Sequence, residues 1–278
     1  MKTKNGAKLC SAILIVVLFP CTFCSVVKAQ DDYYHQDFRW SYNGSEWTLS
    51  LDIPKSTYEL YKNVPVSNRL NYPTFGYSYL TTTNDAYLKM VAEKLEEVSS
   101  REGYGSYDEV GFVLAFIQSL PYTSDSVTSD YDEYARFPLE TLVDNGGDCE
   151  DTSILFATLT LIMGYGTVYI NPPDHYAVGV LGENLPGSYY VYNGKTYYYC
   201  ETAGDGWEIG GLPSEYRNAE VTIYEINVNE QCPHSVLNPG FVPSFDVEEF
   251  LRSPFLWLIV ISIVIAVVSL DSWLRKRK

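Results

Sequence analysis

The stretch Gly146-Gly147-Asp148-Cys149-Glu150-Asp151 leads into an apolar pattern through Leu161 that predicts a helix. It puts a cysteine at the first turn of this helix, directly after a glycine turn. A helix N-terminus lowers the pKa of a thiol, because backbone amides and the helix dipole stabilise the nucleophilic thiolate. We therefore expect Cys149 to be a nucleophile. The alternative role for Cys149 is that of a small buried apolar side chain.

A histidine and an acid follow Cys149 at equal spacing. His175 lies 26 residues after Cys149, and Glu201 lies 26 residues after His175. A cysteine, a histidine and an acid, each expected at an end of a regular element, form the set that nucleophilic catalysis requires. The other two histidines, His35 and His234, lie toward the two ends of the chain and compete poorly for this role.

Helical patterns precede strand patterns along the chain. Helices are expected over 85–100, from Ser106 to just before Pro121, from Pro138 to about Asn145, and from Cys149 to Met163. We expect Thr83-Asn84 to cap the first, and a Ser106–Glu109 capping box to begin the second. Strands are expected over 166–170, 176–181, 189–192, 195–201 and 221–228. A hairpin over 38–53 with an Asn43-Gly44 turn, a short helix from Pro54 to Tyr61 and a loop over 63–79 come first. This order predicts an α+β fold.

Both ends of the chain carry membrane-related patterns. Three lysines precede the apolar run Leu9 to Phe19, which predicts a secretory signal over 1–29; an uncleaved N-terminal anchor is the alternative. The uncharged run Phe255 to Leu270 predicts a transmembrane helix over 253–274. The basic tail 275–278 is then expected in the cytoplasm and the rest outside the cell. The predicted parts between are an N-terminal hairpin and loop region over 30–80, a catalytic domain over 81–230 and a stalk over 231–252.

The charge of the exported part is strongly negative. Residues 31–253 hold 11 Lys and Arg against 34 Asp and Glu, a net charge of −23. This balance excludes non-specific nucleic-acid binding. Three cysteines remain after the signal, namely Cys149, Cys200 and Cys232. An odd count predicts one free thiol, and Cys200–Cys232 is then the pair available for a disulfide.

Three short stretches resemble one superfamily. Asp148-Cys149-Glu150-Asp151, Gln118-Ser119-Leu120-Pro121-Tyr122 and Pro173-Asp174-His175 are similar to archaeal transglutaminase-like surface proteins and bacterial transglutaminase-like cysteine peptidases. The resemblance covers about residues 83–206 and implies a papain-like Cys-His-Asp core. This chain departs from the pattern at Glu201, where the family usually has aspartate. Asp205 is the other acid available for that place.

The resemblance implies acyl transfer. Cys149 would attack a carbonyl, His175 would move the proton, and Glu201 would orient the imidazole. The oxyanion would be held by the backbone N–H of Cys149 and by Gln118. We expect a membrane-anchored extracellular thiol hydrolase acting on peptide or isopeptide bonds of surface proteins or wall polymer. A protein-glutamine transglutaminase and a non-catalytic surface binding module are the alternatives.

Acids surround the expected nucleophile and oppose a thiolate. The resemblance implies calcium at Asp148, Glu150 and Asp151, and hard cations prefer carboxylate oxygens. Asp125, Asp130 and Asp132 are further ligands to consider. The alternative is that these acids only complement the helix dipole. The chemistry itself requires no cofactor.

Overall fold

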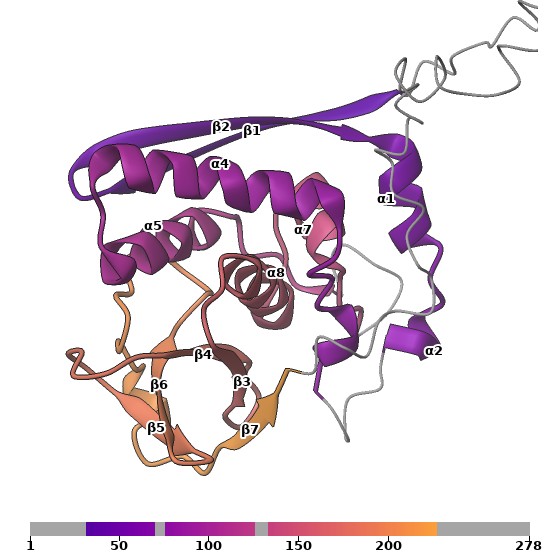
Figure 1. Cartoon of the computed structure of the whole chain (residues 1–278). Helices are drawn as coiled ribbons and strands as arrows, with labels where there is room; N and C mark the ends of the chain where they lie inside the picture. Colours follow the sequence, from indigo (N-terminus) through magenta and orange to yellow (C-terminus); the bar gives the residue numbers. More distant parts are fainter. Residues whose placement is uncertain (1–31, 70–75, 126–132, 227–278) are drawn as a thin grey trace, which may run out of the picture. The chain divides into compact units, whose positions relative to one another are not determined.

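The computed structural model describes residues 32–69, 76–125 and 133–226 (Figure 1). The predicted signal, stalk, transmembrane helix and tail lie outside these residues, so their bounds stay predictions. Within the described ranges, no helix combines the length and apolar character needed to cross a bilayer.

The N-terminal hairpin has the predicted turn. Strands β1 (Tyr33–Tyr42) and β2 (Ser45–Pro54) pair antiparallel. Asn43 and Gly44 join them with φ of 49° and 73°, the backbone that a tight hairpin turn needs. Helix α1 (Lys55–Lys62) follows, as expected. The hairpin is held to the helices by aromatic contacts, in which Phe38 and Trp40 of β1 meet Phe116 at ring distances of 5.4 and 5.0 Å.

Four helices separate the hairpin from the sheet (Figure 1). They are α4 (Ala86–Glu102), α5 (Ser106–Gln118), α7 (Pro138–Asp144) and α8 (Cys149–Ile162). Helix α8 is buried from Glu150 to Thr160, because α4, α5 and α7 pack around it and β3 and β4 cover another side. A helix that is apolar on every face belongs in such a central position. Cys149 therefore begins a helix that lies at the centre of the described core.

Two predicted caps and one predicted loop are wrong. Helix α4 is capped by Asp85, whose carboxylate accepts from the backbone N–H of Tyr87 at 2.7 Å and of Leu88 at 3.0 Å, and not by Thr83-Asn84. Helix α5 has no side-chain cap, because the Glu109 carboxylate accepts instead from the Tyr165 hydroxyl. A neighbouring residue therefore caps α4, whereas at α5 a tertiary partner outcompetes local capping.

The predicted loop over 63–79 contains two short helices, α2 (Val66–Arg69) and η1 (Ser78–Leu80). Arg69 is buried and its guanidinium donates to the Glu140 carboxylate at 2.6 Å. This ion pair between distant segments explains why local sequence did not reveal α2.

The sheet consists of five antiparallel strands in the order β5-β6-β4-β3-β7. They are β3 (Thr167–Asn171), β4 (Ala177–Leu181), β5 (Tyr189–Tyr192), β6 (Lys195–Cys200) and β7 (Thr222–Glu225). Each matches a predicted strand, and the helix-then-sheet order of the predicted α+β fold is confirmed. Val178 pairs with Cys200, so the first residues of β4 and the last residues of β6 lie side by side at one end of these strands. His175 precedes β4 and Glu201 follows β6, which brings these two residues together.

Candidate active site

The turn before Cys149 requires its two glycines. Gly146 has φ of 147°, and a Cβ there would lie 2.5 Å from the Pro121 carbonyl oxygen. A Cβ at Gly147 would collide with the Asp151 carboxylate. The carboxylate needs that space because it accepts from the Asp148 backbone N–H at 3.4 Å. The glycines therefore allow the chain to enter α8 tightly enough to place Cys149 in its first turn.

Buried hydroxyl groups hold the three segments of the site together. Ser153 of α8 donates to the Tyr176 carbonyl at 3.1 Å, next to His175. Thr202, next to Glu201, lies 2.9 Å from the Ser153 hydroxyl and 3.0 Å from the Thr152 hydroxyl. All three hydroxyls are buried, where a hydrogen bond fixes geometry most firmly. The positions of the nucleophile, the histidine and the acid are thus linked by side chains that the sequence alone did not single out.

Glu201 holds the His175 ring. Nε2 of His175 lies 2.9 Å from one carboxylate oxygen of Glu201 and 3.1 Å from the other. The Tyr199 hydroxyl and the Ala203 backbone N–H also donate to this carboxylate, at 2.9 and 3.1 Å. The Tyr216 ring stacks on the imidazole at 5.0 Å with an interplanar angle of 7°. Because Nε2 is engaged, Nδ1 is the nitrogen that is left for a thiol proton.

Cys149 and His175 line the same cavity, of about 790 Å³. The backbone N–H of Tyr176 also donates to the Cys149 sulfur, which joins the start of α8 to the residue after the histidine. Asp205, the other acid considered for the triad, lines a different cavity with Trp207. The arrangement therefore brings together Cys149, His175 and Glu201.

The side-chain amide of Gln118 is occupied by other hydrogen bonds. Its side-chain amide nitrogen donates to the backbone carbonyls of Glu201 at 2.8 Å and Trp207 at 3.0 Å. Both amide protons are thereby used. Gln118 fixes the segment that carries Glu201, and its predicted part in the oxyanion hole is not supported by this geometry.

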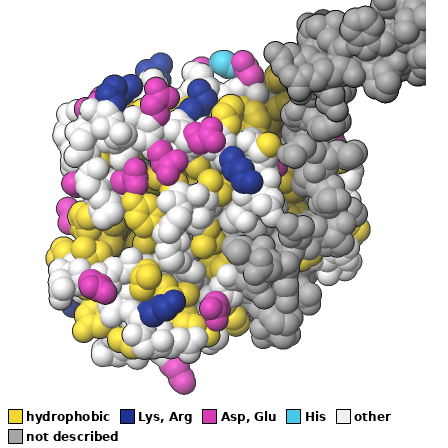
Figure 2. All heavy atoms as spheres, in the orientation of Figure 1, with side chains coloured by type: hydrophobic (Ala, Val, Ile, Leu, Met, Phe, Trp, Pro, Cys, Tyr) yellow, Lys and Arg dark blue, Asp and Glu magenta, His cyan; other side chains and the backbone are white. Residues whose placement is uncertain are grey.

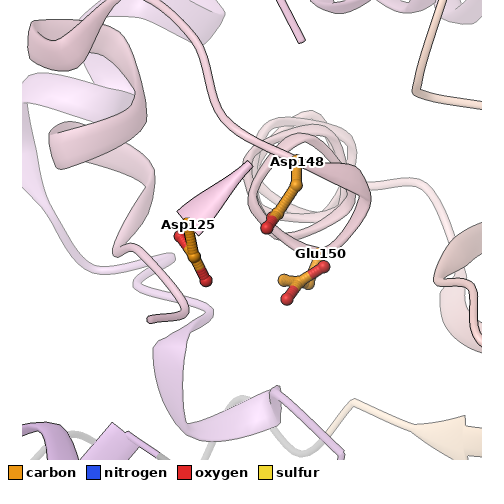
Figure 3. A group of neighbouring side chains, drawn as sticks. All are labelled: Asp125, Asp148 and Glu150. Carbon is orange, nitrogen blue, oxygen red and sulfur yellow. The ribbon is translucent and has the colours of Figure 1, made fainter. Parts of the chain in front are cut away.

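Three carboxylates meet beside Cys149. Asp125, Asp148 and Glu150 offer oxygens that all lie within 4.8 Å of one another, and Figure 3 shows them turned toward a common space at the start of α8. One oxygen of Asp148 is buried without a hydrogen-bond partner. Burial, reinforced by the charges of Glu150 and Asp125, raises the pKa of Asp148 to about 8. A buried oxygen with no donor, among like charges, is what a hard cation would satisfy.

Asp151 does not belong to this group, contrary to the prediction. It is fully buried and accepts from the Arg136 backbone N–H at 2.6 Å and from the Arg136 guanidinium. Asp125 takes its place in the group, while Asp130 and Asp132 lie outside the described residues. Sequence reasoning missed Arg136 because an ion pair between segments leaves no local pattern.

The pKa of the Cys149 thiol is raised, opposite to the expectation from the helix N-terminus. Burial is the largest cause, followed by the charge of Glu150, whose carboxylate accepts from the Cys149 thiol at 3.2 Å. Burial and the adjacent acids together therefore outweigh the effect of the helix N-terminus on the thiol. Cys200 is buried as well, and Cys232 lies outside the described residues, so their disulfide stays a prediction.

Comparisons with known proteins give weak similarity. No family model and no curated protein matches the chain. Among solved structures, EGTA-treated Legionella pneumophila LapG has 15% identity and a TM-score of 0.34, over 52% of this chain and 86% of that one. Calcium-bound Legionella pneumophila LapG has 17% identity and a TM-score of 0.29, over 48% and 87%. The crystal structure of a TGase has 13% identity and a TM-score of 0.31, over 65% of this chain and 47% of that one. Similarity of this size carries no argument about the function of this chain.

Proposed function

We propose that this chain is a thiol hydrolase of the transglutaminase-like type, acting on peptide or isopeptide bonds through Cys149, His175 and Glu201. One observation carries the proposal: Cys149 and His175 line one cavity, and the Glu201 carboxylate holds Nε2 of His175. A nucleophile, a base and a group that orients the base are the minimal set for acyl transfer.

The reaction follows from this geometry. Nδ1 of His175 takes the thiol proton as the Cys149 sulfur bonds to the substrate carbonyl carbon. The imidazolium then gives that proton to the leaving amine as the carbon–nitrogen bond breaks, leaving a thioester. Water, deprotonated by His175, releases the acid and regenerates the thiol. Glu201 keeps the ring in place and stabilises the imidazolium throughout.

The position of Cys149 at the start of α8 supports the predicted oxyanion role of its backbone N–H. The backbone N–H of Cys149 lies in the first helical turn, where amides have no partner within the helix and the dipole favours negative charge. The developing oxyanion would lie against this end of the helix.

Asp125, Asp148 and Glu150 fit a calcium ion, because they supply hard oxygens and one of them is buried without a donor. Bound calcium would offset the field of the carboxylates around the thiol. Glu150 engaged in this way would no longer accept from the Cys149 thiol, which would leave the thiol for His175.

The place of the enzyme in the cell is part of the proposal. The predicted signal and the predicted C-terminal helix support a domain anchored to the membrane and facing outward, with surface proteins or wall polymer as substrate. The strongly acidic composition agrees with a domain that does not bind nucleic acid.

The test uses the full-length chain purified in mild detergent with calcium. It is incubated with cell-surface protein extract and with peptide pools, and new termini are detected by mass spectrometry. We expect cleavage that is lost in Cys149→Ala and His175→Ala. Adding a primary amine tells hydrolysis from transamidation, since a transglutaminase would incorporate the amine. Failure of wild-type chain to cleave or label any substrate would contradict the enzymatic proposal and favour a binding module.

A further inference from the structure

The cavity that holds Cys149 and His175 is strongly acidic. Its lining includes the carboxylates of Glu133, Glu150, Asp174 and Glu220, and none of the described residues that line it is lysine or arginine. Three of these acids, Glu133, Asp174 and Glu220, are exposed to solvent. They are therefore free to meet a ligand that enters the cavity.

The exposed acids come from three separate segments. Asp174 directly precedes His175, and Glu220 lies just before β7, whose Thr222 also lines the cavity. Glu133 precedes Tyr134, whose backbone N–H donates to Asp125, one of the three carboxylates that meet beside Cys149. The fold has thus gathered negative charge around the reacting groups from distant parts of the chain.

Among the described residues, no lysine or arginine forms an ion pair with Glu133, Asp174 or Glu220. Arg136, the guanidinium that contacts the acid group, is buried and pairs with Asp125, Asp144 and Asp151. Calcium bound by three carboxylates would still leave one negative charge on its own ligands. By contrast, Figure 2 shows acidic and basic side chains interspersed on the face over α4. A concave surface lined by one sign of charge focuses the field toward its interior.

An exposed aromatic residue lies on the segment that runs beside the turn before Cys149. Tyr122 is 60% exposed and pairs with Gly147, two residues before Cys149. A large exposed aromatic side chain next to a nucleophile offers a face for a cation and an apolar surface for its aliphatic stem. This observation is independent of the acids and points to the same kind of ligand.

We propose that the substrate of this site is a cationic polypeptide segment, with lysine or arginine residues flanking the bond that Cys149 attacks. This inference rests on the proposed function. The carboxylates of Glu133, Asp174 and Glu220 would pair with these side chains, and Tyr122 would pack against them. Segments rich in aspartate or glutamate would be repelled from the cleft.

Binding and cleavage are tested separately, so that the two proposals fail separately. Binding is measured by fluorescence anisotropy on the full-length Cys149→Ala chain with calcium, using labelled peptides of equal length with Lys/Arg, Ser/Asn or Asp/Glu flanks. At low salt we expect the cationic peptides to bind at least about 10-fold more tightly than the acidic ones. This difference in affinity should become smaller in high salt. Equal binding of all three pools, or preference for the acidic pool, would overturn the inference.

Matched variants assign the effect to the cleft. The combined Glu133→Gln, Asp174→Asn and Glu220→Gln substitutions should reduce the preference several-fold. The combined Glu93→Gln, Glu97→Gln and Glu183→Gln substitutions change net charge equally at exposed positions outside the cavity, and should leave it unchanged. An equal loss in both variants would show a general charge effect and contradict the assignment. Selective binding without any cleavage by the wild-type chain would retain the inference about the ligand and reject the hydrolase.

Discussion

Nε2 of His175 lies 2.9 Å from the Glu201 carboxylate, which is itself fixed by the Tyr199 hydroxyl and the Ala203 backbone N–H. Glutamate thus reaches the histidine although it is one methylene longer than the aspartate that the resemblance implies. The Glu201 carboxylate can reach the imidazole because Glu201 directly follows β6, next to the residues where β4 begins.

Replacing Glu201 tests this relationship. We expect Glu201→Gln to lower kcat by about 10²-fold or more, because an amide does not stabilise the imidazolium. KM should change little, since Glu201 is buried behind the histidine. Steady-state kinetics on a cleaved peptide measures both. The matched control is Glu208→Gln, an exposed glutamate on the same loop that lines a different cavity. Equal kcat for wild type and Glu201→Gln would contradict the assigned role.

The three carboxylates of Asp125, Asp148 and Glu150 predict an unusual dependence of stability on pH. Folded Asp148 has a pKa of about 8, whereas an unfolded aspartate has a pKa of about 4, so the folded state binds more protons between these values. In EGTA, Tm should therefore fall as pH rises from about 5 to about 8.

Calcium should raise Tm and flatten this slope, because it stabilises the ionised carboxylates and binds the folded state. Differential scanning fluorimetry across pH, in calcium and in EGTA, checks both effects. Asp148→Asn should flatten the slope in EGTA and reduce the calcium effect. Identical Tm values in calcium and EGTA for the wild type would reject the metal site.

Asp148 and Asp151 should behave in opposite ways, although they are three residues apart. Asp151→Asn removes the fully buried one of the three carboxylates that pair with Arg136, and should cost about 1–3 kcal/mol of unfolding free energy, in calcium or EGTA. Asp148→Asn removes a carboxylate that is repelled by its neighbours and has one buried oxygen without a partner, so it should not destabilise the chain in EGTA. Urea unfolding of both variants measures the difference. A calcium-dependent loss in Asp151→Asn would return Asp151 to the metal site.

The predicted topology is tested in cells. Protease added outside should remove an epitope placed within residues 31–250 and spare one fused after Lys278, because the basic tail is expected to stay in the cytoplasm. Permeabilised cells provide the control, in which both epitopes are removed. The reverse pattern of protection in intact cells would contradict the orientation.

The sequence predicted the longer helices and the strands because each rests on local patterns, whereas it missed α2 and η1. The Asn43-Gly44 turn, the apolar helix after Cys149 and the period-two strands are all set by neighbouring residues, and the structure confirms them. The partners of charged side chains were harder to predict, because these partners lie far along the chain. The ion pair of Asp151 with Arg136 and the buried contact of Arg69 with Glu140 depend on packing between segments. The same reason hid Ser153 and Thr202, which fix the site.

The most direct test of the account is the order in which the cysteines of the folded chain react. With calcium near neutral pH, iodoacetamide should alkylate Cys149 first, and His175→Ala and EGTA should each slow that labelling. Cys200 is buried and should react only on unfolding. Mass spectrometry of quenched time points gives the rates. Labelling of Cys200 or Cys232 first, with Cys149 inert in the folded chain, would contradict the assignment of Cys149 as the nucleophile.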